Sequence, residues 1–194
     1  MMPAADFVGS VENYKGSFRY SNIFPQNSKL NRHVWAEAED LARNLIKYQG
    51  LQTLWVYTGI GFNKSKGELG SYEQNVSILG TDEGGMAYPD FVFKIFYGLS
   101  GDKSYIFSFL LPNSPPRHSR TVLIDHSVSV ETIEKSVGLN LPKELKSSNN
   151  LDLCAYFDCK LGEAEDEDSN WQSDYTDDQN KKSKKVNLCR NREL

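Results

Sequence analysis

Residues 31–48 are the segment that most constrains the fold, because their apolar side chains repeat with the period of an α-helix. At about 100° per residue, the apolar side chains gather on one face and most charged side chains occupy the other. A helix with one apolar face buries that face against another element, so the chain needs a sheet or a second helix to cover it. We expect the helix to end before Gly50. Its apolar face consists of Val34, Trp35, Ala38, Leu41, Ala42, Leu45 and Ile46.

Three runs rich in β-branched and aromatic residues can supply the strands of a covering sheet: Leu54–Thr58, Tyr88–Tyr97 and Ser104–Leu111. Turn-forming residues at 98–103 separate the last two runs, which predicts a hairpin. The sequence therefore predicts the α+β class, with a mostly antiparallel central sheet flanked by helices.

Four weaker patterns complete the expected elements. Residues 1–30 are irregular apart from a short strand at 18–24, whose residues alternate. Residues 62–85 predict a long glycine-rich loop, with a strand around 76–79. Val130–Val137 predicts a helix that Ser129 caps and Gly138 ends.

Charge is distributed unevenly along the 194 residues, whose net charge is −4. Residues 1–162 carry 16 basic and 17 acidic side chains, whereas 163–178 are acidic and 179–194 basic. We expect one domain over 1–162 and a disordered tail over 163–194, because the tail has too few apolar residues to offset its ordering entropy. No run reaches the roughly 20 apolar residues of a membrane span, and the N-terminus does not have the pattern of a signal peptide. The near-neutral domain shows no basic footprint for nucleic acid, so a function must be argued from motifs.

Three cysteines leave two interpretations open. Cys154 and Cys159 have a spacing that could close a small disulfide loop in an oxidising compartment, and free thiols in a reducing compartment are the alternative. Cys189 then stays unpaired within the chain.

Asn31 stands out because it is a carboxamide in the centre of the apolar face, in the first turn of the predicted helix. A buried carboxamide needs hydrogen-bond partners, or it costs about 1–3 kcal/mol. Two structural interpretations are a helix cap and a satisfied polar group at the edge of the core. The functional interpretation is that its oxygen binds a metal or contacts a phosphate, since Mg²⁺ takes few protein ligands and keeps most of its waters.

Three other polar residues lie near Asn31 in the sequence. Glu39 falls at the border of the apolar face, where a carboxylate is either a solvated border residue or a support for metal-bound water. Asn22 and Gln26 precede the helix and are ordinary turn residues by their position alone.

With these residues in view, the sequence resembles the DNA/RNA nonspecific endonuclease family, which includes mitochondrial endonuclease G and secreted bacterial nucleases. The resemblance covers about residues 1–145 and leaves out the charged tail. Later segments similar in order and spacing lie at 56–59, 88–94, 109–113 and 129–139. The specific motifs are Pro-Ala-Ala-Asp-Phe at 3–7, Ser-Asn-Ile-Phe-Pro-Gln at 21–26, and Leu-Asn-Arg-His-Val-Trp at 30–35 followed by Glu39.

The resemblance implies a ββα-metal active site, in which two strands and a helix grip one divalent cation. Asn31 matches the family's single direct protein ligand of Mg²⁺ (or Mn²⁺), and Glu39 matches the residue that supports the metal-bound waters. Asn22 lies in the same cleft of the family, so Asn22 and Glu39 are the expected catalytic residues, and Asn22 and Gln26 the expected substrate contacts. The implied function is hydrolysis of phosphodiester bonds in DNA and RNA without sequence preference, since backbone contacts do not read bases.

The sequence departs from the family at the general base. The family's Asp-Arg-Gly-His segment is expected immediately before Met1, and His33, His118 and His126 do not stand at the matching position. We therefore expect an N-terminally truncated version of the fold. Losing a general base costs about 10²–10⁴-fold in rate, and losing strands exposes a sheet edge, so we expect poor folding and little cleavage from the chain as written.

Two other interpretations come from different functional classes. A catalytically inactive nuclease-fold paralogue would bind nucleic acid or a protein partner without cutting. An α+β interaction protein would carry the motif by chance. Under the nuclease interpretation the expected partners are DNA and RNA, a homodimer is compatible, and no membrane partner is indicated. Family members are secreted or mitochondrial, and no targeting signal identifies a compartment here.

Overall fold

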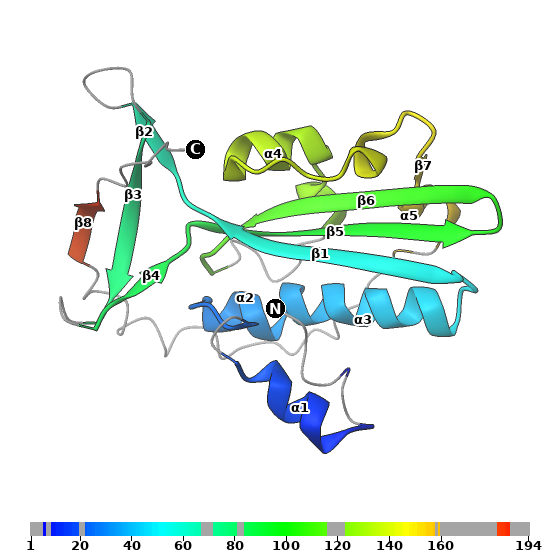
Figure 1. The fold of residues 1–194 in the computed structure, drawn as a ribbon, viewed down its shortest axis with the longest axis horizontal. Helices are drawn as coiled ribbons and strands as arrows, with labels where there is room; N and C mark the ends of the chain where they lie inside the picture. The colour runs from blue at the N-terminus through cyan, green and yellow to red at the C-terminus, as the bar shows by residue number, and fades with distance from the viewer. Residues whose placement is uncertain are drawn as a thin grey trace, which may run out of the picture.

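The fold is organised around an antiparallel sheet in which β5 lies between β1 and β6 (Figure 1). The structure is a computed structural model that describes residues 6, 9–19, 22–66, 72–80, 84–115, 123–157, 159 and 182–186. The prediction of the α+β class with a mostly antiparallel central sheet is confirmed. The strands are β1 (Thr53–Gly61), β5 (Phe91–Ser100) and β6 (Lys103–Pro112), with β7 (Leu151–Asp152) added in parallel to β6.

The hairpin of β5 and β6 forms where the sequence predicts it. Gly101 in the connecting turn has a φ of 61°, a left-handed conformation that other residues rarely adopt. The register places Phe96 opposite Phe107 and Lys94 opposite Phe109. β5 begins later than expected because Pro89 cannot donate to a ladder and the residues before it belong to another strand.

Alternate side chains of β5 and β6 face two different helical layers. Figure 1 shows α2 and α3 along one side of the sheet and α4 on the other. On the α4 side, Phe93 and Ile95 pack with Val130, Ile133 and Leu145. On the α3 side, the buried core includes Leu30, Val34, Trp35, Leu41, Leu45, Val92, Phe96, Phe107, Phe109 and Leu111.

The predicted helix at 31–48 consists of two helices, α2 (Ser28–Arg32) and α3 (Val34–Lys47). His33 separates them with φ −113° and ψ −95°, outside the helical region. The predicted apolar face of α3 is buried at Val34, Trp35, Ala38, Leu41 and Leu45, but Ala42 is half-buried and Ile46 is 43% exposed. The position of Asn31 in the centre of that face is wrong, because the helical phase does not continue across His33 and Asn31 is exposed.

The first 30 residues contain a helix that the sequence pattern did not predict, α1 (Val11–Ser17). The side chain of Ser10 caps it by accepting a hydrogen bond from the Asn13 N–H at 3.3 Å. The strand predicted at 18–24 is wrong, because Phe18 caps the end of α1 and the described residues 22–27 contain no strand. Phe18 and Ile23 are 56% and 47% exposed, so the alternation does not bury one face of a strand.

A second sheet occupies much of the segment predicted as a glycine-rich loop. It is antiparallel and contains β2 (Lys64–Lys66), β3 (Tyr72–Leu79) and β4 (Met86–Tyr88). The strand predicted at 76–79 is confirmed as part of β3. The prediction of a long loop around it is wrong, because glycines in this segment lie between short strands.

The free edge of β3 pairs with β8 (Lys182–Val186), a segment within the tail that we expected to be disordered. An open strand edge can pair with extended backbone, and the disordered tail otherwise stays a prediction. The other residues of 163–194, and Cys189 among them, lie outside the described residues. The boundary at 162 stays a prediction.

The C-terminal part of the domain follows the sequence closely. α4 (Val130–Val137) starts after Ser129, whose side chain accepts from the Thr132 N–H, and ends at Gly138 with a φ of 72°. Cys154 and Cys159 form a disulfide bond next to α5 (Leu153–Tyr156), so the oxidised interpretation of this pair is confirmed. Within the described ranges, no helix has the length and apolar character that a membrane crossing requires.

Candidate functional site

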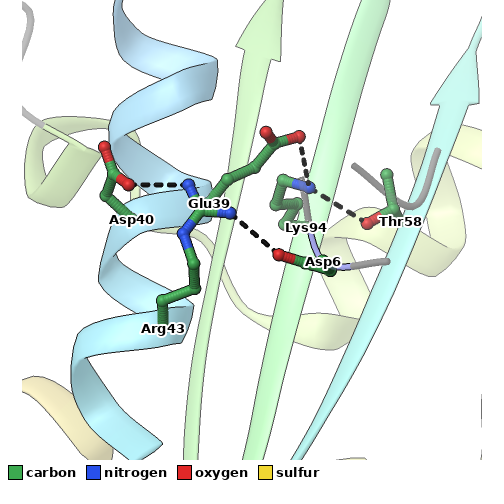
Figure 2. A network of polar contacts seen from close by, with 6 residues as sticks. All are labelled: Asp6, Glu39, Asp40, Arg43, Thr58 and Lys94. Carbon is green, nitrogen blue, oxygen red and sulfur yellow. Dashed lines mark hydrogen bonds and ion pairs between the residues drawn. The ribbon is translucent and has the colours of Figure 1, made fainter. Parts of the chain in front are cut away.

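Lys94 lies in the centre of β5, on the face covered by α3, and its side chain is 2% exposed. Its cross-strand neighbour in β1 is Thr58, and its Nζ donates a hydrogen bond to Thr58 Oγ1 at 3.3 Å. α3 contributes Trp35 and Glu39, which lie on one helix face because they are four residues apart. Nζ is 3.8 Å from Glu39 Oε1 (Figure 2). It is also 4.2 Å from the Trp35 ring centroid. A cation–π contact, a hydrogen bond and an ion pair therefore meet at one buried ammonium.

Burial opposes the charged forms of both members of the ion pair. It lowers the pKa of Lys94 to about 8, and the carboxylates of Glu39 and Asp6 partly counteract this. Burial likewise raises the pKa of Glu39 above its usual value, against the lowering effects of Lys94 and then Arg43. Glu39 is 19% exposed, so it is the member of the pair that reaches solvent.

Arg43 extends the network one turn further along α3. Its guanidinium donates to Asp6 Oδ1 at 2.9 Å and to Asp40 Oδ1 at 2.6 Å (Figure 2). The contact with Asp6 ties the N-terminal part of the chain to α3. Glu39 therefore lies in the field of two fixed cations, one buried and one partly exposed.

Asn31 is presented by α2, whose start is capped by the preceding turn. Asn27 Oδ1 accepts from the N–H groups of Lys29 and Leu30 at 3.0 and 3.2 Å, and the Asn31 N–H donates to the Asn27 carbonyl at 2.9 Å. The cap is thus Asn27, and the exposure of Asn31 rules out a satisfied core amide. No described residue hydrogen-bonds to the Asn31 carboxamide, so its oxygen is available to a ligand.

Asn113, at the end of β6, fixes the turn that leads into α2. Its side chain is buried and makes three hydrogen bonds: Oδ1 accepts from Asn27 N at 2.8 Å, and Nδ2 donates to the carbonyls of Pro25 and Pro89 at 3.1 and 2.9 Å. The sheet thereby holds the capping residue of the helix that presents Asn31.

The two predicted substrate contacts occupy the same turn. Asn22 is half-buried, and its Nδ2 donates to the Ser17 carbonyl at 2.8 Å, which links the turn to α1. Gln26 Nε2 is buried and has no hydrogen-bond partner within the described residues. No hydrogen bond or ion pair between described residues joins Asn31 to Glu39.

Asn31 offers one carboxamide oxygen to a cation. In the part of the chain that the structure describes, no group of three or more His, Cys, Asp or Glu side chains could hold a metal ion. A single exposed carboxamide oxygen suits a cation that keeps most of its waters and takes few protein ligands, which is how Mg²⁺ commonly binds. The residues present therefore fit a magnesium-type site with one direct protein ligand.

The histidines stand apart from the network. His33 is exposed at the break between α2 and α3, and His126 is half-buried in the 3-10 helix Leu123–His126. Among the described residues, neither contacts Lys94, Glu39 or Arg43. His118 lies outside the described residues.

Four members of this network were not predicted from the sequence: Asp6, Arg43, Thr58 and Lys94. Lys94 had a usable signal, because it is a single charge inside the apolar run Phe-Val-Phe-Lys-Ile-Phe. A lysine in a strand buried on both faces needs a partner, which points to a carboxylate on the covering helix. Arg43 had a weaker signal, its i+4 spacing from Glu39.

Comparison with known proteins matches this chain to nucleases. Nuclease C1 of Cunninghamella echinulata var. echinulata is 32% identical over 163 residues, which cover 83% of this chain and 62% of that protein. The nuclease of Syncephalastrum racemosum is 33% identical, over 82% of this chain and 51% of that protein. The mitochondrial nuclease 1 of Schizosaccharomyces pombe is 31% identical, over 82% and 50%. The chain thus spans between half and about three-fifths of the length of these relatives.

A solved structure shows the same fold. The chain aligns with a protein in the crystal structure of the EndoG/EndoGI complex with a TM-score of 0.61 and 24% identity, over 73% of this chain and 56% of the other. The model of the DNA/RNA non-specific endonuclease family matches residues 1–148. A chance motif in an unrelated α+β protein is therefore excluded, and this chain belongs to the DNA/RNA non-specific endonuclease family.

Proposed function

We propose that this chain acts on the sugar–phosphate backbone of both DNA and RNA as a metal-dependent endonuclease without sequence preference. The observation that carries the proposal is the exposed carboxamide of Asn31, which hydrogen-bonds to no described residue and is held on a capped helix directly before the helix that carries Glu39. Family membership supports it, and contacts restricted to the backbone would explain indifference to base.

Each predicted site residue has a role in this proposal. Asn31 would hold Mg²⁺ or Mn²⁺, which supplies Lewis-acid stabilisation of charge at the phosphate. Glu39, at the solvent end of its ion pair, would accept hydrogen bonds from water at the site. Asn22 and Gln26 would contact the substrate. The buried Nε2 of Gln26 is a donor that the described residues leave unused, which supports a contact formed on binding.

Among the described residues, no side chain is assigned as the general base. Lys94 is 2% exposed, and its ammonium is engaged by Trp35, Thr58 and Glu39. An inactive paralogue that binds nucleic acid or a protein partner is therefore the second candidate. A homodimer is also proposed, with sedimentation velocity as its test.

The test combines cleavage with metal binding on the full chain. Supercoiled plasmid and single-stranded RNA are incubated with Mg²⁺ or with EDTA, and Mn²⁺ binding is titrated in parallel. We expect nicking of both substrates that EDTA abolishes, because the proposed site depends on its cation.

Asn31→Ala is the informative variant, and Asn44→Ala, an exposed asparagine on α3, is its matched control. We expect Asn31→Ala to weaken Mn²⁺ binding and Asn44→Ala to leave it unchanged. Equal Mn²⁺ binding by both variants contradicts the metal site, whereas metal and DNA binding with no cleavage supports the inactive paralogue.

A further inference from the structure

Among the described residues, Lys94 has one ion-pair partner, Glu39. Its Nζ is enclosed by the Trp35 ring and the Thr58 hydroxyl, and the carboxylate within ion-pair distance is that of Glu39. The lysine is 2% exposed and Glu39 is 19% exposed, so the glutamate is the member of the ion pair that reaches solvent.

We propose that Lys94 is a positioning residue, whose sealed ammonium keeps the Glu39 carboxylate ionised and in one orientation for accepting hydrogen bonds from water at the site. This rests on the proposed function, because it assigns Lys94 a task only if Glu39 supports bound water. Three elements share the work: β5 supplies the ammonium, β1 holds it with Thr58, and α3 supplies both Trp35 and Glu39.

Energetics argue against a purely structural purpose for this charge. A buried ion pair contributes little net stability, because desolvation offsets its Coulomb attraction, and replacing a whole buried pair by apolar side chains of similar volume is often neutral. The charge instead acts on a neighbouring carboxylate that reaches solvent.

Charged groups around Lys94 define how the pair titrates. The carboxylates of Glu39 and Asp6 favour the protonated lysine, and the Arg43 guanidinium opposes it. Lys94 lowers the pKa of Glu39 more than Arg43 does. Removing the Lys94 ammonium should therefore raise the pKa of Glu39, whereas removing an exposed ammonium elsewhere should not.

The first experiment follows the ¹³C carboxyl resonance of Glu39 against pH in the full chain, with assignment from Glu39→Gln. In the wild type we expect a second inflection near pH 8, where Lys94 loses its proton. In Lys94→Met that inflection disappears and the pKa of Glu39 rises, whereas Lys94→Arg retains the lower pKa. Lys103→Met, an exposed lysine in the hairpin, is the matched control and leaves the profile unchanged.

The second experiment is a double-mutant cycle on Mn²⁺ affinity. We expect Lys94→Met to weaken binding about 10–100-fold, the usual effect of losing a supporting residue, and to have no further effect once Glu39 is glutamine. A Lys94 effect that persists in Glu39→Gln shows that its charge acts on the cation directly and overturns the proposal. Failure of Lys94→Met to fold also overturns it, as does a wild-type Glu39 resonance without the inflection near pH 8.

The two proposals fail in distinguishable ways. If Glu39→Gln changes Mn²⁺ affinity but Lys94→Met does not shift Glu39, the positioning role is wrong and the nuclease site stands. If Asn31→Ala and Glu39→Gln both leave Mn²⁺ affinity unchanged, the proposed site itself is wrong, and the role assigned to Lys94 is overturned with it.

Discussion

Asn113 accepts a hydrogen bond from the backbone N–H of Asn27 at 2.8 Å, across 86 positions of the sequence. Through this bond the end of β6 holds the residue that caps α2, and α2 presents Asn31. The candidate metal ligand is therefore positioned by the sheet and not only by its own helix.

Asn113→Ala should destabilise the fold and loosen the site together. The change removes three hydrogen bonds and leaves the Asn27 N–H and two carbonyls without this partner, at a cost of about 1–3 kcal/mol per buried unsatisfied group. Urea unfolding measures the loss, with exposed Asn140→Ala as the control. Equal free energies of unfolding for the two variants would show that Asn113 does not clamp the turn.

The buried charge of Lys94 should make stability depend on pH in a defined window. Its pKa is about 8 in the fold and 10.5 in the unfolded chain, so the unfolded state binds more protons between these values and stability rises with pH there. The free-energy cost of burying the charged lysine is present in full below pH 8 and is lost by pH 10.5. It amounts to about 3 kcal/mol, since one pKa unit corresponds to about 1.4 kcal/mol.

Lys94→Met removes this penalty, so its free energy of unfolding minus that of the wild type should shrink as pH rises from 7.5 to 10.5. Urea unfolding at a series of pH values tests this. Lys103→Met should give a curve parallel to the wild type. A parallel curve for Lys94→Met would refute the depressed pKa.

Gly59→Ala should destabilise the contact between β1 and β5. Gly59 lies opposite Phe93 in the register, and a Cβ there would overlap the Phe93 ring, which is buried and cannot move freely. Overpacking of this kind costs about 1–3 kcal/mol. Thermal unfolding of Gly84→Ala, whose Cβ would meet nothing within 4 Å, provides the comparison; a drop in Tm of the same size in both variants contradicts the steric explanation.

Reduction of the Cys154–Cys159 bond should lower stability modestly. The bond closes a short loop, with a sequence separation of 5, and chain-entropy arguments assign such a loop about 2 kcal/mol. Denaturant unfolding of Cys154→Ser with and without dithiothreitol checks this, and Cys189→Ser serves as the control. Dithiothreitol should destabilise Cys189→Ser and leave Cys154→Ser unaffected; the reverse pattern would assign the disulfide to another pair.

Local patterns were sufficient for the elements whose residues interact mainly with near neighbours. The caps of α4 and the β5–β6 hairpin followed from Ser129, Gly138 and the turn at 98–103, because cap and turn preferences act within a few residues. The family motif likewise identified Asn31 and Glu39 as residues of interest.

Contacts between residues far apart in the sequence could not be predicted from these local patterns. The pairing of β3 with β8 joins segments more than a hundred residues apart, and the clamp from Asn113 to Asn27 spans most of the domain. Lys94 was overlooked because its meaning depends on which helix covers β5. Only the packed arrangement shows that its partners are Trp35 and Glu39.

The non-helical backbone at His33 lets α2 and α3 point in different directions. A continuous helix would carry Asn31 inward with Trp35, so the outward aim of the carboxamide exists only because the backbone turns at that residue. α2 is positioned by the hydrogen bond from Asn27 to Asn113 at the end of β6, whereas α3 is positioned by its packing against the sheet. The distance from Asn31 to Glu39 consequently depends on both contacts, so a substitution at either one would change the geometry of the proposed site without altering Asn31 or Glu39.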